Sequence, residues 1–239
     1  MSRLLALLTA ALVALVFAAC GDDSSSESEA TPEPTATEEA ATTPAAANEF
    51  LPEGCENVEA PAPKEDGTLK APTEKLDESK TYVATMSTTC GDIQITLDAK
   101  DNPITAGSFK YLADQKFYDG LTFHRIVADF VIQGGDPLGQ GTGGAGYSVE
   151  EAPPSDYKYA PGDLAMAKTG DEPAGTSGSQ FFIVTSENGA AQLTPDYAVA
   201  GKVTEGMDVV EKIGGIQADP NTGMPAAQVI IKSVTVEEK

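Results

Sequence analysis

Short apolar runs separated by turn residues fill the chain from residue 81 to residue 239, and this pattern limits the fold more than any other feature. Apolar and polar residues alternate over residues 82–86 and again over residues 93–97, on either side of Cys90-Gly91-Asp92. Alternation with a period of two is typical of a strand with one buried face. The sequence therefore predicts a β-hairpin at the start of this region.

Two segments have helical spacing of their apolar residues instead. The first lies between Pro103 and Tyr118, and the second covers residues 206–213, after which Gly214 and Gly215 are typical of a helix end. Further strands are predicted at residues 121–127, 129–133, 163–167, 180–185, 197–203 and 228–236. This order predicts a mainly β fold, a closed eight-stranded antiparallel barrel capped by two short helices.

The first nineteen residues are predicted to be an export signal. Arg3 supplies a positive start, and Leu4 to Ala19 is an uncharged, mostly apolar run that is short for a membrane span. The junction of Phe17-Ala18-Ala19 with Cys20 resembles a bacterial lipobox, which predicts that Cys20 is lipidated. Simple cleavage and release is the alternative.

Residues 20–75 are predicted to be a disordered tether between the lipidated cysteine and a folded domain of residues 76–239. Residues 20–60 hold eleven acidic side chains and no basic one, and large apolar residues are few. Such a segment buries too little apolar surface to offset its ordering entropy. We expect an extracytoplasmic, monomeric protein that is held to the membrane by its lipid.

The charge and the residue counts exclude several classes of function. Acidic residues outnumber basic ones 37 to 15, so nucleic acid is not an expected partner, because phosphate contacts need Lys or Arg. The chain has one histidine and three cysteines, which excludes multi-histidine zinc sites and four-cysteine clusters. Cys55 and Cys90 are a candidate disulfide, given an oxidising compartment, and two free thiols are the alternative.

Three segments carry the strongest functional signal. Residues 123–136 run from Phe-His-Arg-Ile-Val to Gln-Gly-Gly-Asp, residues 141–144 are Gly-Thr-Gly-Gly, and residues 164–183 contain Leu-Ala-Met-Ala and Gly-Ser-Gln-Phe-Phe-Ile. In this order and spacing they resemble the cyclophilin family of peptidyl-prolyl cis–trans isomerases, from about Tyr82 to the C-terminus. The resemblance implies a cyclophilin-like barrel, prolyl isomerase activity and proline-containing exported polypeptides as substrates.

Prolyl isomerisation makes modest chemical demands. Amide resonance sets a rotation barrier of about 18–20 kcal/mol. Lowering it requires an apolar socket for the proline ring and a fixed donor that withdraws the prolyl nitrogen lone pair from conjugation. No metal or cofactor is expected. An arginine suits the donor role, because it is always charged and rigidly forked.

The resemblance assigns roles to individual residues. Arg125 matches the catalytic arginine, and Gln133 matches the side chain that orients it and contacts the substrate backbone. The predicted substrate-binding residues are Phe130, Val131, Ala167, Phe182, Leu193, Tyr197 and His124. For His124, a structural role as a hydrogen-bonded strand residue is the alternative.

Three departures from the family pattern keep a second function open. Lys168 stands where asparagine is usual, Gln192 replaces a common tryptophan, and Ala200 replaces a common phenylalanine. A peptide-binding or holdase module with negligible isomerase activity is therefore the alternative function.

Overall fold

A computed structural model describes residues 48–59 and 61–239. The predicted signal peptide (residues 1–19), Cys20 and residues 20–47 of the predicted tether lie outside the described residues. Within the described part, no helix is both long and apolar enough to cross a membrane.

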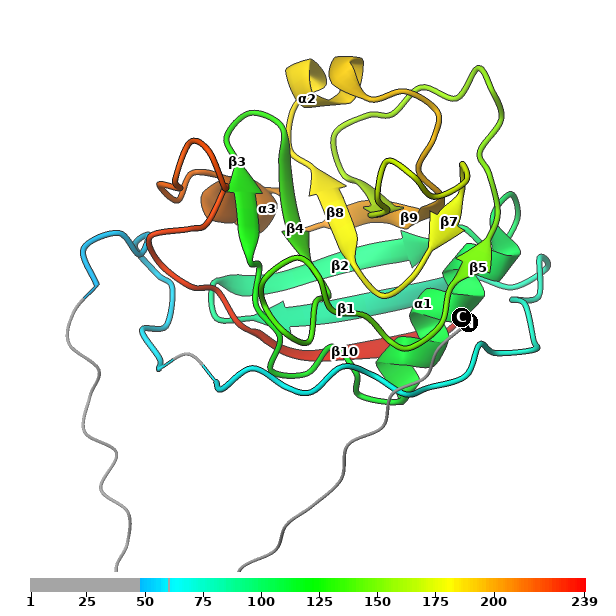
Figure 1. Ribbon diagram of the computed structural model, residues 1–239, viewed down its shortest axis with the longest axis horizontal. Coiled ribbons are helices and arrows are strands. Elements are labelled where there is room, and N and C mark those ends of the chain that lie inside the picture. The colour runs from blue at the N-terminus through cyan, green and yellow to red at the C-terminus, as the bar shows by residue number, and fades with distance from the viewer. Residues whose placement is uncertain (1–47, 60) are drawn as a thin grey trace, which may run out of the picture. The chain divides into compact units, whose positions relative to one another are not determined.

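One curled, antiparallel sheet forms most of the domain, in the strand order β10-β1-β2-β9-β6-β8-β4-β3. In Figure 1, β1, β2 and β10 run across the view, whereas β3, β4 and β8 stand nearly upright, so the sheet curls strongly along its length. A separate two-stranded sheet pairs β5 with β7. The strands are β1 (Tyr82–Thr88), β2 (Gly91–Leu97), β3 (Arg125–Val127), β4 (Val131–Gly134), β5 (Val149–Glu150), β6 (Asp163–Met166), β7 (Thr176–Ser177), β8 (Phe181–Val184), β9 (Val199–Glu205) and β10 (Ile231–Glu238).

The predicted β-hairpin is confirmed. β1 and β2 pair antiparallel, with Met86 opposite Ile93 and Thr88 opposite Gly91. Tyr82, Ala84 and Met86 of β1 and the apolar residues of β2 are buried, and they alternate with more exposed residues. Gly91 has a φ of +130°, a conformation that side chains rarely adopt and that glycine permits at the turn.

The predicted closure of the barrel is wrong, because the described sheet stays open between its edge strands β3 and β10. The segment before β3 contacts β10 instead: the N–H of Gly120 donates to the carbonyl of Ile231 at 2.7 Å. The edge of β3 that does not pair with β4 contacts another segment, since the N–H of Ile126 donates to the carbonyl of Gly223 at 2.8 Å. The structure is therefore a half-open barrel.

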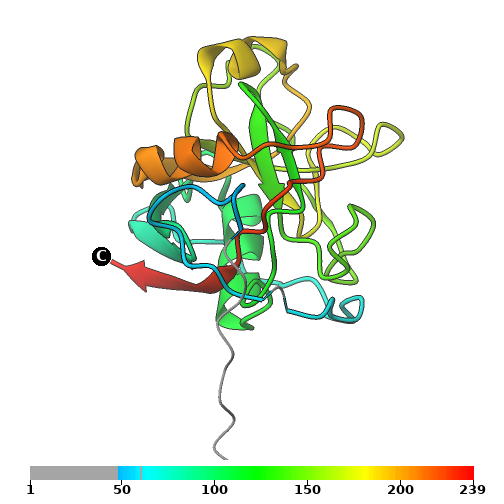
Figure 2. The ribbon, with the colours of Figure 1, turned by 90° about the vertical axis from the view of Figure 1, so that its left-hand side faces the viewer.

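The described residues form three helices where two were predicted. α1 (Pro103–Asp114) and α3 (Met207–Gly214) correspond to the predicted helices. The third, α2 (Glu187–Gln192), begins after Ser186, whose hydroxyl accepts a hydrogen bond from the N–H of Gly189 at 2.9 Å. It lies at the end of the domain remote from β10 (Figures 1 and 2). At six residues it is too short to show a helical period in the sequence.

The sheet is buried on both faces where β4, β6 and β8 pair. Phe181 and Ile183 of β8 point into the main core, whereas Phe182 and Val184 belong to a second hydrophobic cluster. β6 divides its side chains in the same way, so alternate residues of these strands serve different clusters. The remaining buried members of the second cluster are Val131, Tyr159, Ala165, Ala190 and Val199.

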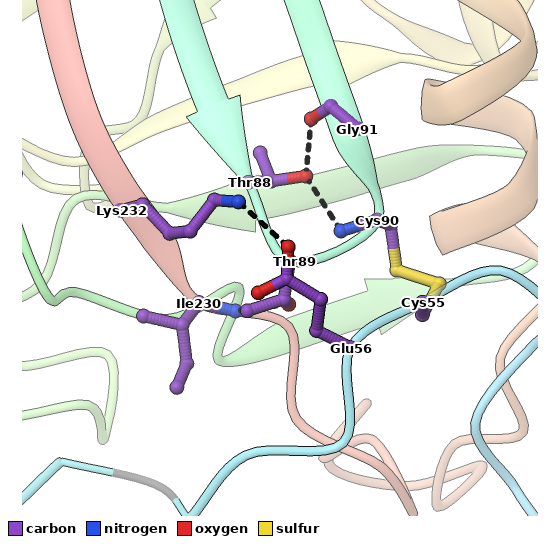
Figure 3. Close-up of a disulfide and its surroundings, with 8 residues drawn as sticks. All are labelled: Cys55, Glu56, Thr88, Thr89, Cys90, Gly91, Ile230 and Lys232. Carbon is purple, nitrogen blue, oxygen red and sulfur yellow. Dashed lines mark hydrogen bonds and ion pairs between the residues drawn. A yellow bond between two sulfur atoms is a disulfide. The ribbon is translucent and has the colours of Figure 1, made fainter.

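Residues 48–59 and 61–75 differ from the disordered tether expected there, because they pack along the domain (Figure 1). Leu51 and Leu69 contact the main core, and Cys55 forms a disulfide with Cys90 in the β1–β2 turn (Figure 3). Next to this bond, the N–H of Glu56 donates to a main-chain carbonyl of the turn at 2.7 Å. Composition alone missed this packing, since it depends on a few apolar residues and one covalent bond.

Candidate active site

A cavity of about 190 Å³ opens on the outer face of the sheet at β3, β4, β6 and β8. It brings together eight of the nine residues predicted to form the catalytic and substrate-binding site, and it adds Lys168. His124 does not line it. The lining residues are Arg125, Phe130, Val131, Gln133, Ala167, Lys168, Phe182, Leu193 and Tyr197.

The floor of this cavity is the second hydrophobic cluster. Val131 and Phe182 project from neighbouring strands of the sheet and are nearly fully buried. Phe130 and Leu193, which flank β4 and α2, pack against the same cluster and remain partly exposed. The ring of Tyr197 meets the ring of Phe182 edge-on, with centroids 5.3 Å apart. Such a floor is large and rigid enough to receive a small apolar ring.

The polar wall of the cavity is built by strand pairing. Arg125 of β3 lies directly opposite Gln133 of β4, so both side chains leave the same face. Nη1 of Arg125 donates a hydrogen bond to Oε1 of Gln133 at 3.1 Å. This bond holds the guanidinium beside the apolar floor, with its other donors free of hydrogen bonds to the described residues.

Gln180 extends this wall, and the sequence analysis assigned it no role. Nε2 of Gln133 donates to Oε1 of Gln180 at 3.1 Å, and Nε2 of Gln180 donates to the carbonyl of Gly143 at 2.9 Å. Gln180 belongs to the Gly-Ser-Gln-Phe-Phe motif, which was the available signal. Its role depends on hydrogen bonds to residues about forty positions earlier in the sequence, and the motif alone does not reveal these bonds.

Tyr159 is a second residue that sequence reasoning missed. Its hydroxyl donates to the carbonyl of Tyr197 at 2.6 Å and accepts from the N–H of the same residue at 3.0 Å. Burial raises the pKa of Tyr159 to about 12, so the hydroxyl keeps its proton and its donor capacity. Tyr159 therefore fixes the backbone of a residue at the cavity rim.

Replacing Tyr159 with phenylalanine should weaken peptide turnover. It leaves the N–H of Tyr197 without its partner, and we expect kcat/KM to fall about fivefold, mainly through a higher KM. Tyr157→Phe is the matched control, because its hydroxyl donates to Asp163 and does not contact Tyr197. Steady-state kinetics on a proline-containing peptide would check this. Equal losses in both variants would contradict the proposed role.

Lys168 is the side chain that the resemblance left in doubt. Only 3% of its side chain is exposed, and its Nζ lies 2.7 Å from Oδ2 of Asp196. The same Nζ donates to the carbonyls of Thr169 and Glu172, and it lies 5.7 Å from the ring centroid of Tyr197. Because the Nζ of Lys168 is bonded to groups of the protein, this side chain stabilises the rim of the cavity.

His124 does not line the cavity, and neither ring nitrogen has a hydrogen-bond partner among the described residues. The structural hydrogen bonds considered for it are therefore not present there. Burial lowers the pKa of His124, the charge of Asp136 opposes this shift, and the charge of Arg125 adds to it. The folded protein consequently favours the neutral imidazole.

The pKa of His124 predicts how stability depends on pH. A histidine with a lowered pKa in the folded state binds more protons when unfolded, so stability falls as the pH drops through the ordinary value of 6.5. Because His124 is the only histidine, this slope should disappear in His124→Phe between about pH 7.5 and 5.5. Urea unfolding at several pH values measures it. A wild-type stability that rises on acidification would contradict the assignment.

A second cavity of about 600 Å³ adjoins the first through Ala167 and Lys168. Residues 141–146, which we call the glycine loop, form much of its wall. The buried carboxylate of Asp136 holds this loop by accepting hydrogen bonds from the N–H groups of five residues. These are Leu138, Gln140, Gly141, Thr142 and Gly143. Over the described ranges, no group of three or more His, Cys, Asp or Glu side chains is placed to hold a metal ion.

Comparisons with known proteins find relatives of this chain. Residues 83–236 match the family described as cyclophilin type peptidyl-prolyl cis-trans isomerase/CLD. Peptidyl-prolyl cis-trans isomerase B of Streptomyces anulatus is 39% identical over 174 residues, which is 65% of this chain and 97% of that protein. A peptidyl-prolyl cis-trans isomerase of Helicobacter pylori is 41% identical over 138 residues, covering 56% of this chain and 82% of that protein.

A solved structure shows the same fold. The cyclophilin type peptidyl-prolyl cis-trans isomerase of Cryptosporidium parvum, in a crystal structure determined in the presence of the dipeptide ala-pro, superposes with a TM-score of 0.60 at 30% identity. The match covers 66% of this chain and 99% of that one.

Proposed function

Because this chain belongs to the family of cyclophilin-type peptidyl-prolyl cis–trans isomerases, we propose that the cavity beside Arg125 is where it isomerises Xaa-Pro bonds. The proline ring would occupy the floor formed by Phe130, Val131 and Phe182. Leu193, at the end of α2, would close one side of this floor. Burying the ring supplies binding energy that can be used to distort the flanking peptide.

Arg125 would act on the prolyl nitrogen. A guanidinium donor near that atom favours the geometry in which its lone pair leaves conjugation, and the C–N bond then rotates more easily. Donors preorganised in this way lower a barrier by about 3–4 kcal/mol in favourable cases. The observation that carries the proposal is the hydrogen bond from Arg125 to Gln133, which holds the guanidinium in the wall of the same cavity as the apolar floor.

A prolyl-peptide assay tests the proposal. We expect the wild-type protein to accelerate cis-to-trans exchange of a short Xaa-Pro peptide, and Phe182→Ala to lose most of this rate, since it removes the floor. Ile230→Ala is a control that shortens an apolar side chain remote from the cavity lining. A wild-type protein that retains unfolded chains without accelerating exchange would support a peptide-binding or holdase module instead.

We further propose that the enzyme works on exported polypeptides outside the cytoplasm, as a lipid-anchored monomer. The apolar run of residues 4–19 and the lipobox-like junction at Cys20 support export and lipidation. The Cys55–Cys90 disulfide supports an oxidising compartment. Uncatalysed proline isomerisation takes tens of seconds or longer, so it can limit the folding of exported chains.

Membrane attachment can be tested separately from activity. We expect the wild-type protein to fractionate with membranes and to carry acyl chains on Cys20, and Cys20→Ser to lose both. Intact-mass measurement would show the modification directly. Recovery of an unmodified wild-type protein in the soluble fraction would refute the anchor and leave the isomerase proposal intact.

A further inference from the structure

We infer that Asp66 and Gly67 are positioning residues for the isomerase reaction, acting through the glycine loop on the side chains that hold Arg125. They belong to the N-terminal strap, by which we mean residues 61–76, outside the matched family region of residues 83–236. The inference rests on the proposed role of Arg125 as the catalytic donor.

The strap and the glycine loop form hydrogen bonds in both directions. The N–H of Gly67 donates to the carbonyl of Gly144 at 2.9 Å, and the N–H of Leu69 donates to the carbonyl of Ala145 at 2.9 Å. In return, the N–H of Gly144 donates to Oδ1 of Asp66 at 3.0 Å. Backbone groups of the loop are thus satisfied by the strap rather than by solvent.

The two backbones also approach too closely for a side chain between them. A Cβ atom at Gly67 would lie 2.6 Å from the carbonyl oxygen of Ala145 and 2.7 Å from its Cα. On the loop side, a Cβ at Gly146 would meet the carbonyl oxygen of Gly67 in the same way. The position of the loop therefore depends on the absence of a side chain at residue 67.

The glycine loop also contacts the active site. The carbonyl of Gly143 accepts the hydrogen bond from Gln180, which is joined through Gln133 to Arg125. The N–H of Gly143 donates to the buried carboxylate of Asp136 at 3.0 Å. A displaced loop would move an acceptor on which the orientation of the guanidinium depends.

The strap is itself fixed to the domain, so it can hold the loop in place. Before the strap, the disulfide joins Cys55 to Cys90 (Figure 3). Within it, the N–H of Lys64 donates to the carbonyl of Pro137 at 2.9 Å, and its Nζ donates to the carbonyl of Asp119 at 2.5 Å. These contacts precede Asp66 and Gly67 in the chain, and after them the N–H of Leu76 donates to the carbonyl of Pro103 at 3.1 Å.

Four variants of the full-length protein test the inference. Asp66→Ala removes the acceptor for Gly144 and should lower kcat about fivefold. Gly67→Ala forces the strap and loop apart and should lower kcat about tenfold. Asp66→Asn keeps an acceptor oxygen and should retain wild-type kcat. Glu65→Ala removes an exposed neighbouring carboxylate that makes no hydrogen bond to the described glycine loop, and it serves as the matched control.

The NMR chemical shifts of the Gln180 side-chain amide provide a second measurement. They report the local hydrogen bonds of this amide in the folded protein, so a general loss of stability should leave them unchanged. They should shift in Asp66→Ala and Gly67→Ala and stay unchanged in Asp66→Asn and Glu65→Ala. Wild-type kcat and unshifted Gln180 signals in the first two variants, with activity still lost in Arg125→Ala, would overturn this inference alone. A wild-type protein without isomerase activity would overturn the proposed function and this inference together.

Discussion

Replacing Arg125 with alanine should lower kcat/KM for prolyl isomerisation about 100-fold, because it removes the donor proposed to act on the prolyl nitrogen. The floor formed by Phe130 and Phe182 remains, so peptide binding should weaken much less than turnover. Protease-free NMR exchange measurements on an Xaa-Pro peptide separate the two quantities.

Arg125→Lys and Lys158→Ala are the informative companions to this variant. Lysine keeps the charge but not the planar fork that donates to Gln133, so most of the loss should persist. Lys158 is exposed and lies outside the cavity lining, so its loss controls for the change in net charge. Activity in Arg125→Ala within about threefold of wild type would exclude a catalytic donor at this position.

Removing the disulfide should give the largest loss of stability. Cys55 and Cys90 are 35 residues apart, and a cross-link over such a loop stabilises a protein by about 3–4 kcal/mol in the chain-entropy account. For a domain of this size, we expect Cys55→Ser combined with Cys90→Ser to lower Tm by about 10 °C. Thermal unfolding followed by circular dichroism measures the shift.

A reductant provides the internal control for this experiment. The wild-type protein in reductant should unfold at the same temperature as the double serine variant, and reductant should not affect the variant further. A wild-type Tm that is insensitive to reductant would mean that Cys55 and Cys90 do not constrain the unfolded chain. Alkylation of both cysteines in the absence of reductant would mean that they are not joined.

The spacing of apolar residues along the sequence correctly predicted the elements that form from neighbouring residues. The hairpin of β1 and β2 follows from alternation around Gly91, and α1 and α3 follow from helical spacing. Closure of the barrel could not be predicted in this way. It depends on whether β3 meets β10, and the edge of β3 is taken by Gly223, almost a hundred residues later in the chain.

In the candidate site too, the sequence predicted the residues that belong to motifs and missed those that act through distant contacts. Arg125, Gln133 and the apolar floor came from motif positions, and the structure gathers them around one cavity. Tyr159 and Asp66 carried no motif, because their importance lies in hydrogen bonds with Tyr197 and Gly144, 38 and 78 residues away. Such pairings are set by how distant segments pack, which no local pattern contains.

The division of β8 between two hydrophobic clusters has a consequence for protein engineering. Phe181 and Ile183 pack in the main core, while Phe182 lines the cavity that would receive the proline ring and Val184 packs in the same second cluster without lining the cavity. Substitutions on the two sides of one strand can therefore be combined with nearly independent effects on selectivity and on thermal tolerance, provided that their side chains share no neighbours. Libraries that vary Val131, which lines the cavity, would retune which residue is accepted beside proline, while Phe181 and Ile183 keep the main core intact.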